Sequence, residues 1–134
     1  MTDKYGVSFV CRLNKGIYAC VSDDISTDEV VITEKQVAHI FEGHTEKEHA
    51  NVIARLAESV QFPDYILEDA DPQTAVILKM FVDENEEHYR VILKLATNDP
   101  KHPLNSIITA FYISEKKWRK YLRNKKILYK RPEI

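Results

Sequence analysis

Hydrophobic residues recur first at helical spacing and then at strand spacing along the chain. The helical spacing predicts one helix at 34–43 and a second at about 45–60. Further along, short runs rich in β-branched and aromatic residues predict four strands, at 65–67, 75–82, 89–95 and 106–113. A last helix at 115–124, with Ser114 as its N-cap, and a short strand at 127–129 complete the pattern.

Polar and turn-forming residues indicate how these elements begin. Thr33, followed by Gln36 at the third position, is the capping-box pattern of a helix start. Near the N-terminus, β-prone runs at 5–11 and 17–21 flank the segment 14–16, which reads Asn-Lys-Gly. This arrangement predicts a β-hairpin.

The connections predict the fold class. The acidic link at 83–87 is too short for a crossover helix, so its flanking strands are expected to be antiparallel. The whole pattern predicts an α+β fold: an N-terminal hairpin and two helices packed on a four-stranded antiparallel meander, with a C-terminal basic helix. With 134 residues, of which 44% are hydrophobic, the chain is expected to form a single domain over 1–134.

Charge is distributed unevenly along the chain. Residues 1–110 contain 10 Lys+Arg against 19 Asp+Glu, whereas residues 111–134 contain 9 against 2, so the two parts carry −9 and +7. A basic segment of this density can follow the phosphates of a nucleic acid. It also suits a solvated surface helix, and charge alone leaves both interpretations open.

Composition also bears on the cellular compartment. No stretch approaches the roughly 20 apolar residues that span a bilayer, and residues 1–9 lack the pattern of a signal peptide. The two cysteines, Cys11 and Cys20, fit a reducing compartment and no structural disulfide. We therefore expect a cytoplasmic protein with no membrane partner.

Several segments together are similar to a known family. They are Ile32-Thr33, His39-Ile40-x-x-Gly43-His44, Leu78-Lys79, Val91-Ile92-Leu93-Lys94 and Asn105 to Phe111, which a Lys/Arg-rich helix follows. These segments resemble the barnase–EndoU–colicin–RelE superfamily of ribonucleases, in particular its phage-associated branch. The resemblance covers about residues 30–130 and leaves out the N-terminal hairpin.

The resemblance implies a fold and an activity. Members pack one or two N-terminal helices on a four-stranded antiparallel sheet and carry the active site on its open face. The implied activity is that of a metal-independent endoribonuclease without a cofactor, a toxin or effector of a mobile element. Its implied substrate is RNA, with tRNA as a candidate, and a cognate inhibitor protein is a further partner to expect.

Two histidines are the candidate acid–base residues. Metal-free RNA cleavage must take a proton from the ribose 2′-hydroxyl and give one to the leaving 5′-oxygen, and the pKa of histidine suits both tasks. We expect His44 to be a general base or acid and His39 to be a second member of the site. The structural alternatives are that His39 is a half-buried helix residue and that His44 caps the helix end.

Three basic strand residues are the candidate phosphate ligands. Lys79 and Lys94 each follow an apolar run, and a charge at such a position must face solvent or be paired. If one face of the sheet is covered and the other open, both lysines are expected on the open face, with Arg90 on the same side as Lys94. Such a surface stabilises charge on phosphate. Ordinary solvent-facing side chains are the alternative.

The last long strand adds polar candidates. Thr109 lies among apolar residues and is a candidate to bond a phosphate oxygen, or else it is only a β-branched strand former. Asn105 and Ser106 are candidate RNA ligands. Unbroken alternation would place Asn105, Thr109 and Phe111 on one face and Ser106 on the other.

The last helix supplies the remaining RNA-binding candidates, which are Lys116, Lys117, Arg119, Lys120 and Arg123. Trp118 and Tyr121 are aromatic and can stack on bases. Together with Leu122 they fit a core-facing stripe better, which leaves the basic residues facing outward.

Other classes of function were weighed on the same residues. His39, His44 and His49 are five apart, which matches neither the i, i+4 pair of a zinc helix nor a finger, so no metal site is expected. Two non-enzymatic interpretations stay open. One is a non-catalytic module that binds nucleic acid or a protein, and the other is an immunity-like protein whose acidic part mimics nucleic acid.

Overall fold

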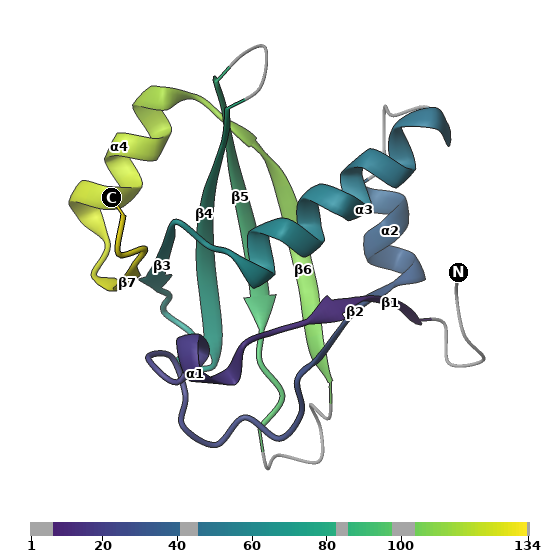
Figure 1. The fold of residues 1–134 in the computed structure, drawn as a ribbon, viewed down its shortest axis with the longest axis horizontal. Coiled ribbons are helices and arrows are strands. Elements are labelled where there is room, and N and C mark those ends of the chain that lie inside the picture. Colours follow the sequence, from purple (N-terminus) through teal and green to yellow (C-terminus); the bar gives the residue numbers. More distant parts are fainter. Residues whose placement is uncertain (1–6, 41–45, 83–85, 98–103, 134) are drawn as a thin grey trace.

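The structure, a computed structural model, describes residues 7–40, 46–82, 86–97 and 104–133 (Figure 1). Its helices are α1 (Lys15–Tyr18), α2 (Glu34–Ile40), α3 (Glu46–Gln61) and α4 (Glu115–Asn124). Its strands are β1 (Val7–Arg12), β2 (Glu29–Thr33), β3 (Tyr65–Glu68), β4 (Thr74–Val82), β5 (Glu86–Lys94), β6 (Asn105–Ile113) and β7 (Ile127–Lys130).

The strands pair in one sheet, in the order β1-β2-β6-β5-β4-β3-β7. Strands β3 to β6 form the predicted antiparallel meander. Strands β1 and β2 extend it at one edge and β7 at the other, and β2 runs parallel to β6. The α+β class is confirmed, whereas four strands were too few. Seven strands pair in the described part of the chain, because the short flanking strands supply hydrogen-bond partners to both edges of the meander.

The helix starts predicted from capping residues are confirmed. The backbone N–H of Gln36 donates to Thr33 Oγ1 at 3.2 Å, and that of Lys117 donates to Ser114 Oγ at 3.1 Å. Helix α3 occupies the segment predicted for the second helix. The predicted end of the first helix at Gly43 lies outside the described residues.

The predicted N-terminal hairpin is wrong. Asn14 does not form a β-turn but caps α1, since its Oδ1 accepts hydrogen bonds from the N–H groups of Gly16 and Ile17 at 2.9 and 3.3 Å. The residues assigned to the second strand instead bring Tyr18 into the core, where its hydroxyl donates to the carbonyl of Val60 at 2.8 Å. The partner of β1 is therefore β2, which lies further along the chain.

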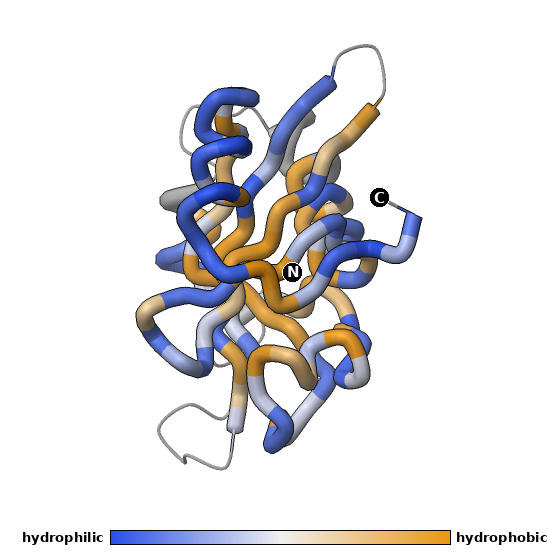
Figure 2. Tube along the Cα trace, turned by 90° about the vertical axis from the view of Figure 1, so that its left-hand side faces the viewer, coloured by the Kyte–Doolittle hydropathy of each residue, from blue (hydrophilic) through white to orange (hydrophobic). Residues whose placement is uncertain are grey.

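The two faces of the sheet are covered to different extents (Figure 1). On the α3 face, Leu56 of α3 packs with Ile77 in the main core. On the opposite face, which we call the α4 face, Trp118 packs with Val76 and Leu78 in a smaller cluster. Helix α4 carries mostly hydrophilic residues around this one contact stripe (Figure 2). The α4 face therefore carries the smaller of the two apolar clusters.

Two further expectations concern the thiols and the membrane. Cys11 is buried and Cys20 is exposed, and both are free thiols in the structure. Burial raises the pKa of the Cys11 thiol to about 12. In the part of the chain that the structure describes, no helix is long and apolar enough to cross a membrane.

Candidate nucleic-acid interface

The strand register gathers several predicted site residues on the α4 face. Residues that lie opposite each other in neighbouring strands point to the same side of a sheet. Arg90 and Lys94 share this face with Leu78 and Thr74 of β4, as the predicted parity of Arg90 and Lys94 requires. On the other side of β5, the partners lie in β6: Arg90 pairs with Phe111, Ile92 with Thr109 and Lys94 with Ser106.

A bulge in β6 decides which of its side chains reach this face. Ile92 pairs with Thr109 but Leu93 pairs with Ile107, so Ile108 is an extra residue. Ile107 is fully buried in the main core on the α3 face, although it lies two positions before Thr109. The unbroken alternation expected for this strand is therefore wrong. Because of the bulge, Thr109 and Ser106 lie on the same face.

Arg90 is held in place by aromatic residues. Its guanidinium carbon lies 3.8 Å from the centre of the Phe111 ring, and its Nη1 donates to the hydroxyl of Tyr121 at 2.8 Å. Cation–π contacts of this kind orient a guanidinium without cancelling its charge. Among the described residues, no carboxylate lies within ion-pair distance of Arg90. Arg90 thus presents a fixed positive charge on the α4 face.

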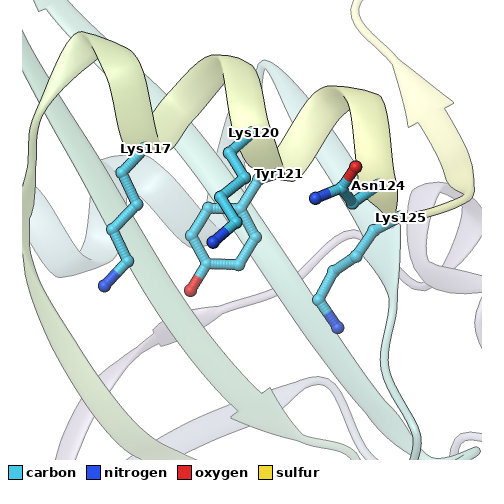
Figure 3. A pocket seen from close by; sticks show the side chains of 5 residues that line it. All are labelled: Lys117, Lys120, Tyr121, Asn124 and Lys125. Atoms are coloured by element: carbon cyan, nitrogen blue, oxygen red, sulfur yellow. The ribbon is translucent and has the colours of Figure 1, made fainter.

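A basic pocket adjoins Arg90 along α4 (Figure 3). It has a volume of about 220 Å³ and is lined by Lys117, Lys120, Tyr121, Asn124 and Lys125, whose side chains leave the helix on the same side. Tyr121 connects the pocket to Arg90, since it also receives the hydrogen bond from the guanidinium. The ammonium nitrogen of Lys117 lies 5.4 Å from the Phe111 ring centre, so the Phe111 ring contacts a cation of the pocket as well as Arg90. Pocket and Arg90 form one continuous positive surface.

Lys94 is paired with an acidic side chain in the loop between β3 and β4. Its Nζ donates to Asp71 Oδ2 at 2.8 Å. This hydrogen bond, together with one from the backbone of Gln73, holds the pKa of Asp71 below its usual value. The same loop supplies Asp69, whose Oδ1 lies 3.8 Å from Lys125 Nζ. Acidic residues therefore border the positive surface on this side.

Comparison with known families shows which family the chain belongs to. A family model described as phage-Barnase-EndoU-ColicinE5/D-RelE like nuclease2 matches residues 12–130. The chain belongs to this nuclease family. The match confirms the resemblance and extends it, because it begins at residue 12, at the end of β1, and not near residue 30. Comparison with curated proteins and with solved structures gives no match.

Membership in this nuclease family gives the domain a substrate class, because a nuclease acts on nucleic acid. Arg90 and Lys94 of the α4 face stay the predicted phosphate ligands.

Lys79 lies on the other face of the sheet of this nuclease. It pairs with Tyr89, so it shares the α3 face, and its side chain is only 12% exposed. Its Nζ donates to the carbonyl of Phe62 at 2.7 Å and lies 3.6 Å from Asp64 Oδ1. The expectation that Lys79 and Lys94 share one open face is wrong, because Lys79 pairs with Tyr89, which lies five positions before Lys94 in β5 and so points to the opposite side of the sheet.

Asn105 is fully buried at the junction of β2 and β6. Its Oδ1 accepts a hydrogen bond from the N–H of Ala96 at 2.7 Å, and its Nδ2 donates to the carbonyls of Thr27 and Glu29 at 2.7 and 2.8 Å. These bonds connect the start of β6 to the segment after β5 and to the start of β2. They use both the oxygen and the nitrogen of the amide. Such an amide serves the fold, and we leave Asn105 out of the RNA-binding site proposed below.

The basic residues of α4 divide into two groups. Lys117 and Lys120 line the pocket, whereas Lys116, Arg119 and Arg123 are exposed and do not line it. Arg119 forms an ion pair with Glu115 at 2.6 Å. The predicted core-facing stripe is confirmed for Trp118, which is buried.

The predicted catalytic histidines lie at the edge of what the structure describes. The backbone of His39 belongs to α2, but its side chain lies outside the described residues, and so does the whole of His44. Their roles stay predictions. Among the described residues, no group of three or more His, Cys, Asp and Glu side chains is arranged to hold a metal ion.

Sequence reasoning missed four residues of the α4 face. Phe111, Asn124 and Lys125 contribute to the surface around Arg90, and the His88 ring lies 5.0 Å from that of Trp118. Parity would have found His88, which is two residues before Arg90 in the same strand. Helical spacing from Lys117 would have found Asn124.

Proposed function

We propose that this nuclease domain is a metal-independent endoribonuclease that cleaves RNA by attack of the ribose 2′-hydroxyl. The observation that supports it is the unneutralised guanidinium of Arg90, oriented by Phe111 and Tyr121 beside a lysine pocket. Fixed cations at this position stabilise the additional negative charge that develops on the phosphate in the transition state. Metal-free cleavage requires this stabilisation from the protein itself.

The reaction would proceed as an in-line transfer of the phosphate. A general base takes the proton of the 2′-hydroxyl, the 2′-oxygen forms a bond to phosphorus, and the bond from phosphorus to the 5′-oxygen breaks. A general acid protonates the leaving 5′-oxygen. The products are a 2′,3′-cyclic phosphate and a free 5′-hydroxyl.

We propose His44 and His39 as the acid–base pair, because the pKa of histidine lies near neutrality. Arg90 holds the scissile phosphate, Lys94 approaches it once Asp71 is displaced, and the Thr109 hydroxyl on the same face donates to a phosphate oxygen. We leave Lys79 and Asn105 out of the reaction, since Lys79 is engaged by Phe62 and Asp64 and the amide of Asn105 is hydrogen-bonded in the core.

The first experiment incubates the purified protein with total bacterial RNA, tRNA included, in excess EDTA. We expect discrete fragments that end in a cyclic phosphate. His44→Ala should lower the cleavage rate about 10²–10⁴-fold, the usual contribution of general acid–base catalysis. His49→Ala is the matched control, because His49 lies in α3 and is not assigned to the site.

The outcome also separates the competing interpretations. Intact RNA after incubation with folded protein would overturn the proposal. If that intact RNA were bound with strong salt dependence, the domain would be a non-catalytic nucleic-acid-binding module. Equal losses for His44→Ala and His49→Ala would remove His44 from the mechanism. A tRNA target, a toxin role and a cognate inhibitor remain predictions that the fragment pattern would begin to test.

A further inference from the structure

We infer that Phe111 and the lysine pocket along α4 form a subsite for a nucleotide beside the cleaved bond, and that this subsite selects single-stranded RNA. This inference rests on the proposed function. The pocket would hold one backbone phosphate and the exposed ring of Phe111 would stack on one base. The chemical step at Arg90 requires neither the stacked base nor the second phosphate, although the Phe111 ring itself also orients Arg90.

The charges in the pocket match a phosphodiester. Within the described part of the chain, Lys117 and Lys120 have no carboxylate partner, and Lys125 is 3.8 Å from Asp69. Two free ammonium groups beside Arg90 repel each other until an anion enters. The volume of about 220 Å³ exceeds many times the roughly 30 Å³ of one water molecule, so a phosphate group fits.

Phe111 supplies the element that distinguishes a single strand from a duplex. Phe111 is 39% exposed, although the cations of Arg90 and Lys117 lie against its ring. An exposed aromatic ring beside cations is the usual arrangement for stacking an unpaired base. Bases in a duplex are stacked on one another and paired, so they cannot reach the ring. A purely phosphate-binding surface would bind both forms.

A second exposed phenylalanine provides a matched control. Phe9 is 57% exposed and shares the α4 face, because it pairs with Val31, which in turn pairs with Ser106. It lies in β1, two strands away from β6 and outside the basic surface. Phe9→Ala and Phe111→Ala therefore remove the same side chain from the same face, and only the second removes it from the proposed subsite.

The test measures binding of a 2′-O-methyl oligonucleotide, which has no free 2′-hydroxyl and so cannot be cleaved by the proposed route. Fluorescence anisotropy compares the single strand with the same strand annealed to its complement. We expect the single strand to bind at least tenfold more tightly. Phe111→Ala should weaken its binding by about fivefold or more, and Phe9→Ala by less than twofold.

Salt dependence tests the phosphate half of the subsite. Lys117→Ala should reduce the slope of log Kd against log salt by about 0.7, the value for one phosphate of a single strand. Lys35→Ala, an exposed lysine in α2, changes the net charge equally and should leave the slope unchanged. Circular dichroism confirms that each variant is folded.

The outcomes distinguish the subsite from the proposed activity. Equal affinity for single strand and duplex, or equal effects of Phe9→Ala and Phe111→Ala, would overturn the subsite even if RNA is cleaved. Selective binding of the single strand that depends on Phe111, from a protein that cleaves no RNA, would retain the subsite and reject the nuclease mechanism.

Discussion

Lys79 and Lys94 differ in role although their local sequences are nearly the same. Each follows three aliphatic residues in a long strand, yet Lys79 lies on the α3 face and Lys94 on the α4 face. The partner of Lys79 is Asp64, whose side chain is 5% exposed, and the partner of Lys94 is Asp71, whose side chain is 42% exposed. The ion pair of Lys79 is therefore buried, whereas that of Lys94 is partly exposed to solvent.

The constraints on the two carboxylates explain that difference. Asp64 also accepts a hydrogen bond from the N–H of Met80 at 2.8 Å, and Arg131 Nε lies 2.9 Å from its Oδ1. Removing one member of such a buried cluster leaves the others uncompensated. Asp71 lies in an exposed loop, where a phosphate can displace it from Lys94. A lysine in a strand is thus structural or available for a ligand according to its face and the burial of its partner.

Among the cations of the two faces, the largest expected effect comes from Arg90, the fixed charge of the α4 face. Arg90→Ala should lower kcat/KM for RNA by about 10²-fold or more, because it removes a preorganised charge from the transition state. Single-turnover kinetics with an RNA that the wild-type protein cleaves measures this loss. Arg12→Ala is the control and should have little effect on kcat/KM. It removes an exposed arginine of β1, which forms an ion pair with Asp28. Similar losses for both variants would reject the special role of the α4 face.

The second effect concerns stability and separates the two lysines directly. Lys79→Ala should lower the free energy of unfolding by about 2 kcal/mol, since it breaks a charge-assisted hydrogen bond to Phe62 and uncovers Asp64. Lys94→Ala should cost less than about 1 kcal/mol, because its ion pair is partly exposed. Urea unfolding provides both values. The rate of RNA cleavage should fall more for Lys94→Ala than for Lys79→Ala. A larger loss of stability for Lys94→Ala than for Lys79→Ala would contradict the comparison.

The smallest effect comes from freeing Lys94. Asp71→Asn should tighten RNA binding by a factor of about 2–5, since an exposed ion pair is worth less than about 1 kcal/mol. The folded-state pKa of Asp71 is lowered, so the stability contributed by the pair is present above the unfolded pKa of about 3.9 and is lost as pH falls through the lowered value. At neutral pH the pair is intact. Binding titrations with the Asn variant at pH 7 would therefore differ from wild type, and unchanged binding would count against displacement of Asp71.

Local patterns predicted the parts of the fold that depend on local interactions. The four strands of the meander and the helices capped by Thr33 and Ser114 depend on neighbouring residues, and the structure contains all of them. The N-terminal segment was misassigned because Asn14 can begin either a turn or a helix. The burial of Tyr18 against Val60, a residue far along the chain, favours the helix.

The candidate site was predictable only in part, for a related reason. Parity within β5 placed Arg90 and Lys94 together, but the position of Lys79 depends on the register between two strands. The bulge at Ile108, which brings Thr109 to the α4 face, leaves no clear mark in an alternating sequence. The pocket along α4 depends on how Trp118 fixes the rotation of the helix on the sheet.

The amide of Asn105 also bears on the order in which a nascent chain can fold. Its partners Thr27 and Glu29 lie 78 and 76 residues earlier, so β2 has no parallel neighbour until β6 has been synthesised. Closing so long a loop carries an entropic cost that only the completed pairing offsets. Strands β3 to β5 can pair before that point, and so can β1 with β2, but β2 cannot join the rest of the sheet until β6 is present. The step that completes the sheet is therefore the step that delivers Thr109 and Phe111 to Arg90, and the candidate site does not exist on the growing chain before it.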